Sequence, residues 1–392
     1  MQSTPREQLL RFSHVLQSVL FERLEPELGP LGPKARLLVA VISLLELSRC
    51  VAGARGWRGR PSKDRQALAT AFLAKAIYGL ETTRQMLARL RTDRQLRCLC
   101  GWNTAQKIPH ESTFSRAFAE FAHSELPQRL HEALIHQTQQ DRLIGHIARD
   151  STAIEARERF PENPPSKPTR QKHKRGPRRK RTMPPAARTR IEEQRLVPAS
   201  QMLSELPRHC SLGVKKSSKG HQQYWRGYKL HLDVADGQIP ITALLTGACL
   251  HDSQVAIPLM TLTSQRVTYL YELMDAAYDA NAIDAHSRSL GHIPLIALNG
   301  ATAPISKLQQ DSLRGYDKRR KAPTHYGRKR LPFTPAQEQR FELRTMVERV
   351  YSRLKDEFGA RFIRVRGASK IMAHLMFGVL ALTVDQLLKL TG

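Results

Sequence analysis

The feature that most constrains the fold lies between residues 228 and 247. Apolar residues there alternate with polar ones, and the apolar set is Tyr228, Leu230, Leu232 and Val234. A period of two is typical of a β-strand with one buried face. Asp236-Gly237 follows directly, and a second apolar run begins at Ile239. An Asp-Gly pair between two such runs strongly predicts a tight antiparallel hairpin, so we expect a sheet.

The segments around this hairpin predict a mixed sheet with helices on its faces. Three further short apolar runs, at 143–154, 267–275 and 293–299, are typical of buried strands. Helices are expected to begin near Ser253, to run from 281 to about 290, and to run from 337 to 358. Asp252 and Asp279 are expected to cap the first two of these helices. This order of elements predicts an α/β fold.

Residues 1–140 are predicted to form an all-α N-terminal domain. Apolar residues recur at helical spacing from Leu9 to Leu20, and stronger helical segments follow at 64–78, 82–90 and 112–121. Ser112 or Thr113 is expected to cap the last of these. Short helices with tight connections are compatible with a DNA-binding helix-turn-helix and equally with a plain helical bundle. We expect this domain to bind DNA.

The charge of the chain indicates its partner. Lys and Arg number 63 against 35 Asp and Glu, which gives a formal net charge of +28. Such a charge points to nucleic acid first and to an anionic membrane surface second. A membrane span needs about 20 apolar residues, whereas the run at 37–47 is short and the run at 371–390 contains charged residues. Without a recognisable signal peptide or metal-ligand spacing among its five cysteines, the chain is expected to be reduced and cytoplasmic.

A basic, proline-rich insertion is expected to interrupt the sheet domain at about 157–222. Its densest part, 161–190, holds seven prolines, eleven Lys or Arg and one acid. This composition cannot bury a core, so we expect a disordered arm. Contact with DNA phosphates is the favoured role, and a solvated surface segment is the alternative. A second basic stretch, 314–330, carries eight Lys or Arg and one Asp.

Three carboxylates are candidates for metal-assisted chemistry. Asp150 lies within or at the end of the first strand, and Asp275 closes the strand at 267–275. A carboxylate in an apolar strand is costly unless it has a partner or a metal ion. At helical spacing, one face of the helix at 337–358 presents Phe341, Arg344, Glu348 and Lys355, and the opposite face presents Leu343, Val347, Val350 and Leu354. An ordinary solvated face with an Arg344–Glu348 pair is the alternative interpretation.

These residues resemble the bacterial insertion-sequence transposases of the DDE superfamily, whose catalytic core is a ribonuclease-H-like sheet. RDST around Asp150 resembles the first-aspartate strand, and LMDAAYDA around Asp275 resembles the second. RGYKLHLDVADGQIPITALLTGACLHDSQ resembles the hairpin and the entry to the next helix. The family's Tyr-x2-Arg-x3-Glu-x6-Lys signature is matched, with Phe in place of the usual Tyr, by Phe341, Arg344, Glu348 and Lys355. Residues 108–122 resemble the helical domain that often precedes this core.

The resemblance implies a ribonuclease-H-like catalytic domain over residues 141–392. Asp150, Asp275 and Glu348 would be the catalytic triad and would hold Mg²⁺, for which Mn²⁺ can substitute. Arg344, Lys355 and Phe341 would contact DNA near the scissile phosphate. The implied reaction is cleavage at the terminal inverted repeats, followed by attack of the freed 3′-OH on target DNA. The expected partners are double-stranded DNA and a second copy of the chain on that DNA, in the bacterial cytoplasm at the nucleoid.

Three other interpretations stay open. A tyrosine recombinase uses an HxxR motif, which His146 and Arg149 provide, but the next tyrosine is the distant Tyr224. A nuclease on the same fold would share the three carboxylates and would lack strand transfer. A non-transposing DNA-binding protein could descend from the same fold.

Overall fold

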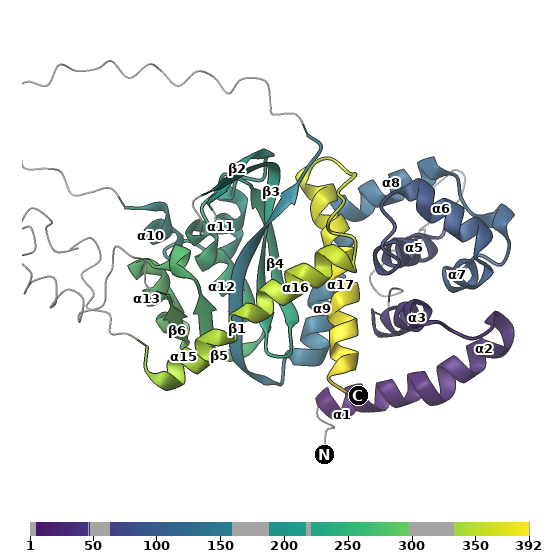
Figure 1. Cartoon of the computed structure of the whole chain (residues 1–392), viewed down its shortest axis with the longest axis horizontal. Helices are drawn as coiled ribbons and strands as arrows, with labels where there is room; N and C mark the ends of the chain where they lie inside the picture. The colour runs from purple at the N-terminus through teal and green to yellow at the C-terminus, as the bar shows by residue number, and fades with distance from the viewer. Residues whose placement is uncertain are drawn as a thin grey trace, which may run out of the picture.

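The computed structural model describes residues 5–45, 47, 63–158, 188–216, 221–297 and 333–391. A six-stranded sheet lies on one side of the long helix α17 (Ala368–Lys389), and the N-terminal helices α2, α3 and α5 to α8 lie on the other side (Figure 1). The strands are β1 (Leu143–Glu155), β2 (Ser211–Lys216), β3 (Gln222–Ala235), β4 (Ile239–Gly247), β5 (Thr268–Met274) and β6 (Ile293–Ile296).

The sheet is mixed, as the sequence predicts. Its strands are ordered β2-β3-β1-β5-β6, and β4 also pairs with β3. β1 runs antiparallel to β3 and parallel to β5, and β5 runs parallel to β6. The predicted hairpin is confirmed: β3 and β4 pair antiparallel around Asp236, Gly237 and Gln238. Gly237 has a φ of 81°, a left-handed conformation that glycine adopts without strain.

Helices cover both faces of the sheet. Asp233 of β3 faces α12 (Ser253–Arg266), where its carboxylate accepts a 2.6 Å hydrogen bond from Thr263. Side chains alternate between faces along a strand, so Leu232 points to the opposite face, which α16 (Thr345–Asp356) covers. In the β1–β3 register Asp150 lies opposite Leu232. Asp150 therefore faces α16. α13 (Asn281–Ser289) packs beside α12.

The C-terminal helix α17 (Ala368–Lys389) joins the N-terminal helices to the sheet. It packs against α3, α5, α8 and α9 and also against β4, so one hydrophobic core runs through all of them. By length and composition α17 could cross a membrane, yet 72% of its most apolar window is buried inside the protein. The N-terminal elements are α1 (Pro5–Val15), η1 (Leu16–Phe21), α2 (Glu22–Leu28), α3 (Pro33–Leu45), α5 (Arg65–Ile77), α6 (Thr83–Thr92), α7 (Arg94–Leu99), η2 (Ala105–Lys107), α8 (Glu111–His123) and α9 (Leu126–Gln139).

The insertion expected at 157–222 contains regular structure where the structure describes it. Residues 188–216 form α10 (Arg190–Gln194), α11 (Ala199–Glu205) and β2. The apolar side chains of Met202 and Leu206 are buried in clusters that include residues of α12. This burial explains why the segment is ordered although its composition is polar. Residues 161–187 of the predicted arm and the basic stretch 314–330 lie outside the described residues.

Two further local predictions are wrong. The helix expected at 337–358 is divided into α15 (Pro335–Glu342) and α16, with Leu343 and Arg344 in a turn between them. This turn rotates Leu343 away from the apolar face, and its side chain is 43% exposed. The expected caps also differ. Asp252 is at the N-cap position of α12 as predicted, but its side chain makes no capping hydrogen bond; Ala280 is at the N-cap position of α13 in place of Asp279, and His110 caps α8 in place of Ser112 or Thr113.

Candidate active site

Asp150 and Asp275 lie side by side because their strands are parallel neighbours. β1 and β5 pair with Arg149 opposite Met274. The next residue on each chain is an aspartate, so the two carboxylates lie at the same level of the sheet. The carboxyl ends of parallel strands are where α/β sheets hold their ligands. The structure thus brings together the two aspartates that the sequence singles out.

The environment of the two aspartates disfavours their ionisation. Burial raises the pKa of Asp150 to about 6; the N–H of Ser151, 2.7 Å from Oδ1, opposes this rise, and the charge of Asp275 adds to it. Burial also raises the pKa of Asp275, although its Oδ1 accepts a 2.9 Å hydrogen bond from the N–H of Ala277. Buried, mutually repelling carboxylates are a common signature of functional sites and suit a bound cation.

Glu348 reaches this pair through Arg344. The Arg344 guanidinium lies 2.8 Å from Oε1 of Glu348 and 3.8 Å from Oδ2 of Asp150. It therefore bridges the carboxylate of α16 and that of β1. The i, i+4 pair of the alternative interpretation is present, and the Glu348 side chain is 52% exposed. Because the same arginine also faces Asp150, the pair belongs to the carboxylate cluster rather than to an isolated solvated face.

Lys355 and Phe341, the outer residues of the signature, have different surroundings. Lys355 donates a 2.6 Å hydrogen bond from Nζ to Oγ1 of Thr152, two residues beyond Asp150. Burial lowers the pKa of Lys355. Phe341 lies on α15, before the turn, and its ring packs against that of Phe333 with 5.2 Å between centroids. Lys355 thus lies beside β1, the strand that carries Asp150, whereas Phe341 packs against Phe333 on the other side of the turn.

Tyr351 is a site residue that sequence reasoning missed. Its hydroxyl lies 2.6 Å from the main-chain oxygen of Asp150 and 3.0 Å from that of Leu230, and it donates between them. This buried contact fixes α16 on β1 at the position of Asp150. The available signal was a tyrosine among the apolar positions of the helix, because a buried phenolic hydroxyl requires a partner.

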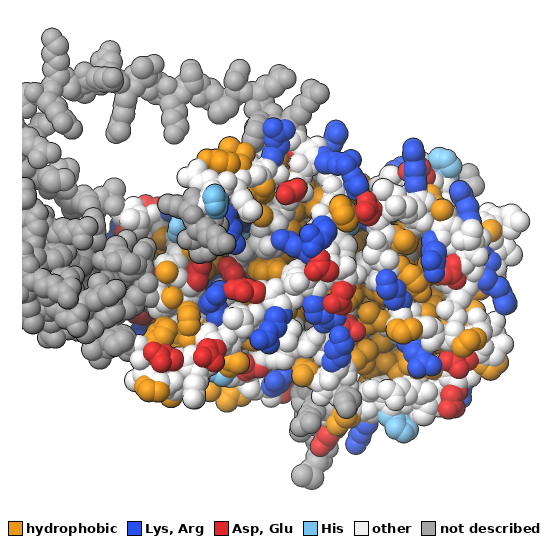
Figure 2. Space-filling view, viewed as in Figure 1, with side chains coloured by type: hydrophobic (Ala, Val, Ile, Leu, Met, Phe, Trp, Pro, Cys, Tyr) orange, Lys and Arg blue, Asp and Glu red, His pale blue; other side chains and the backbone are white. Residues whose placement is uncertain are grey.

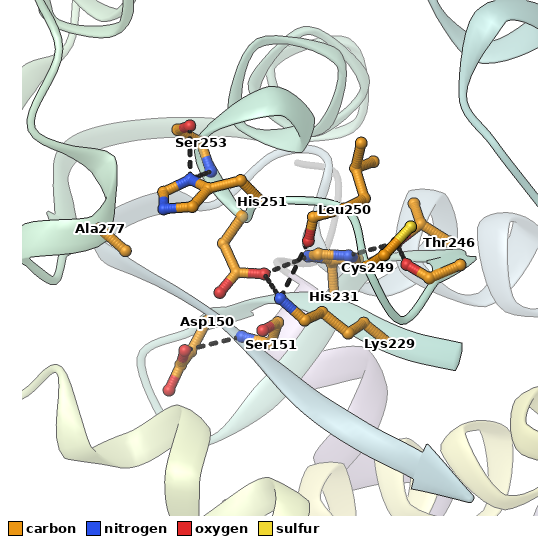
Figure 3. A network of polar contacts seen from close by, with 12 residues as sticks. Asp150, Ser151, Lys229, His231, Thr246, Cys249, Leu250, His251, Ser253 and Ala277 are labelled. Carbon is orange, nitrogen blue, oxygen red and sulfur yellow. Dashed lines mark hydrogen bonds and ion pairs between the residues drawn. The ribbon is translucent and has the colours of Figure 1, made fainter. Parts of the chain in front are cut away.

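A second polar network lies beside Asp150 on the α12 face of the sheet (Figure 3). Lys229 donates from Nζ to Oδ1 of Asp252 at 3.0 Å and to the main-chain oxygen of Leu250 at 2.9 Å. Burial alone would raise the pKa of Asp252, but His231 and Lys229 outweigh burial and lower it. Asp252 is therefore an ionised neighbour of Asp150 and Asp275.

His251, rather than Asp252, accepts a hydrogen bond from the first N–H of α12. Its Nδ1 accepts a 3.3 Å hydrogen bond from the N–H of Ser253 and lies 2.8 Å from the Ser253 hydroxyl. Figure 3 shows His251 turned toward Ser253. The negative charge of Asp252 meanwhile raises the pKa of both Asp150 and Asp275. The prediction failed because the partner of Asp252, Lys229, lies 23 residues earlier on β3.

Arg149 and His146 are engaged within the protein. The Arg149 side chain, 1% exposed, donates to both carboxylate oxygens of Asp233, at 2.8 and 2.6 Å, and approaches Glu272 at 3.4 Å. His146 pairs with Asp236 at 3.0 Å. An arginine enclosed in this way cannot reach a DNA phosphate. This burial removes the tyrosine-recombinase interpretation.

The carboxylates suit a divalent ion chemically. Mg²⁺ prefers oxygen ligands and is commonly held by a few carboxylates together with waters. Within the described residues, no three His, Cys, Asp or Glu side chains lie close enough together to hold one ion. The Arg344 guanidinium instead compensates Asp150 and Glu348 at once. A positive group between these carboxylates indicates where a metal ion would bind once Arg344 releases Glu348.

Comparison with known proteins gives two matches. The family profile described as Transposase DDE domain matches residues 141–384, more than half of the chain, and spans all three carboxylates. The profile described as Transposase domain (DUF772) matches residues 26–120, within the N-terminal helices. Neither the curated proteins nor the solved structures include a significant match.

Proposed function

Since this chain belongs to the transposase DDE domain family, and is a DNA transposase with a ribonuclease-H-like fold, we propose that Asp150, Asp275 and Glu348 are its catalytic carboxylates. The observation that carries the proposal is the meeting of three elements at one point. The charge of Asp275, directly after β5, raises the pKa of Asp150 on β1, and Arg344 links Asp150 to Glu348 of α16.

The three carboxylates would hold Mg²⁺ or Mn²⁺. When bound, such an ion activates the attacking oxygen and stabilises the leaving oxygen of a phosphodiester. The raised pKa of Asp150 supports this assignment, because a cation would offset both the burial and the repulsion by Asp275 that now disfavour the ionised form of Asp150. Asp252, held by Lys229, adds negative charge to the site without joining the ligand set.

The other side chains would position DNA. Once Arg344 no longer pairs with Glu348, its positive charge would bind the scissile phosphate. Lys355, further along α16, would contact the DNA backbone. Phe341 supports the start of this helical segment by packing, and Tyr351 keeps α16 fixed on β1. We propose cleavage at the terminal inverted repeats and attack of the freed 3′-OH on target DNA, without a covalent protein intermediate. The N-terminal helices would bind DNA, and two copies would act together on it.

A cleavage-and-joining assay tests this proposal. Purified full-length protein is incubated with a labelled duplex carrying the terminal repeat that flanks its own gene, a plasmid target, and Mg²⁺ or Mn²⁺. We expect metal-dependent nicking at the repeat end and transfer of label to the plasmid, both lost in Asp275→Asn. Cleavage without transfer would favour a nuclease. Tight binding without either product would favour a non-transposing DNA-binding protein.

A further inference from the structure

A cavity lies between the N-terminal helices and α17, and none of the three carboxylates lines it. Its volume is about 420 Å³, and its walls come from α5, α6, α8, α17 and the loop that leads into α17. Figure 2 shows apolar side chains in the hollow between α17 and the N-terminal helices, with Lys and Arg side chains around it. Both matched regions of the chain therefore contribute to this cavity.

The floor of the cavity is aromatic. Phe72 of α5 packs against Phe118 of α8 with 4.8 Å between ring centroids, and against Phe377 of α17 with 5.8 Å. Each of these rings is almost entirely buried. Interlocked rings from three helices make a rigid base, so the groups above them are held in fixed positions.

Lys75 lines this cavity and has no partner there. Its side chain is only 8% exposed, and no hydrogen bond or ion pair reaches Nζ within the part of the chain that the structure describes. Burial lowers the pKa of Lys75 to about 8, although Glu81 opposes the effect. The group is therefore still mainly protonated at neutral pH. A buried, unpaired ammonium is costly, so an anion in the cavity would complete its environment.

Further cations surround Lys75, and the hydroxyl groups of Thr83 and Ser115 also line the cavity. Arg366 and Lys370 line the cavity, are exposed, and make no ion pair among the described residues. Arg364 also lines it and holds Glu81 at 2.7 Å. Several donors around one small volume suit an anion with several oxygens. We propose that this cavity binds a phosphate group, with Lys75, Arg366 and Lys370 as its charged donors.

DNA is the expected source of that phosphate, an assignment that rests on the proposed function. From Glu348 to Lys355 the rise along α16 is about 10.5 Å, or about three nucleotides at 3.4 Å per nucleotide of one strand. The positive charge of Arg361, in the loop after α16, lowers the pKa of Lys355 in addition to burial, so these cations are neighbours. The same loop continues to Arg366 at the cavity rim. A DNA strand that leaves the carboxylates along Lys355 and Arg361 would follow this loop toward Arg366 and the cavity.

Lys75→Met is the variant that tests the site, because it removes the charge and keeps the apolar stem. Two quantities are measured: the thermal midpoint in inorganic phosphate against chloride at equal ionic strength, and the salt dependence of duplex DNA binding. We expect phosphate to stabilise the wild type and not the variant. We expect the slope of log K against log salt to fall by about 0.9 in magnitude, the value for one phosphate contact. Lys389→Met, at the other end of α17, should change neither quantity.

The outcomes separate the possible ligands. Stabilisation by phosphate with an unchanged DNA slope would overturn DNA as the source and assign a free phosphate or nucleotide. No stabilisation and no slope change would overturn the site. If Lys75→Met fails to fold, the exposed Arg366→Gln gives the same two readouts. Both readouts, phosphate stabilisation and the DNA-binding slope, are measured without cleavage, so a failure of the proposed catalysis and a failure of this site would be seen separately.

Discussion

Replacing Arg149 with methionine removes the cation that pairs with Asp233 and Glu272 in a buried network beneath the proposed catalytic strand. Its guanidinium compensates Asp233 at 2.6 Å and Glu272 at 3.4 Å, and all three side chains are at most 1% exposed. Thr263 and Tyr269 would still donate to these carboxylates, and methionine would fill much of the vacated volume. Leaving buried charges without their partner costs about 3–5 kcal/mol, so we expect a loss of this size in the free energy of unfolding.

Urea unfolding at neutral pH measures this loss, with the exposed Arg349→Met as the control, for which a change within about 0.5 kcal/mol is expected. Burial already raises the pKa of Asp233, and removal of Arg149 raises it further. A folded-state pKa above the unfolded value of about 3.9 means that the folded state takes up protons first. The deficit should therefore shrink as the pH falls toward 5. A loss below about 1 kcal/mol, or a loss independent of pH, would contradict the role of Arg149 in compensating these buried carboxylates.

Three further predictions concern the site, the core and DNA. Tyr351→Phe should cost about 1–3 kcal/mol in unfolding free energy and slow DNA cleavage, because α16 loses its bond to the Asp150 carbonyl; unchanged values in both assays would contradict this role. Burial lowers the pKa of His131 to about 3, so the unfolded chain binds its proton first below pH 6.5, and stability falls with acid. Relative to His131→Asn, the wild type should lose about 1.6 kcal/mol of unfolding free energy between pH 6.5 and 5, measured by urea titration, and parallel pH curves would contradict the assignment. Lys355→Ala should lower the magnitude of the DNA-binding salt slope by about 0.9, and an unchanged slope would remove Lys355 from the phosphate contacts.

Local patterns predicted those parts of the fold that local forces determine. The alternation around Tyr228 and the Asp236-Gly237 turn give the hairpin, and short apolar runs give β1, β5 and β6. The order within residues 188–216 was missed because it depends on burial of Met202 and Leu206 against α12. The position of α17 in the middle of the structure could not be predicted either, since its partners among the N-terminal helices lie more than 200 residues earlier.

In the candidate site too, the residues could be predicted from the sequence, whereas the contacts that support them could not. Asp150, Asp275 and Glu348 were found as residues whose type and spacing match a metal-dependent family, and the structure brings them to one region. Their supporting contacts depend on strand register and on helix docking, which no short pattern encodes. The Tyr351 hydroxyl meets Asp150 across 201 residues of chain, and Lys229 meets Asp252 from another strand.

The assignment of Glu348 as the catalytic glutamate is tested most directly by the single-turnover rate of Mg²⁺-dependent cleavage at the element end. This rate is compared between Glu348→Gln and Glu357→Gln. Both glutamates belong to i, i+4 pairs with an arginine at 2.8 Å and are about equally exposed, at 52% and 50%. Only Glu348 is linked to Asp150 through its arginine. The account predicts a loss of at least about 10²-fold in Glu348→Gln and a near wild-type rate in Glu357→Gln. Equal rates in the two variants would contradict the assignment of the catalytic glutamate.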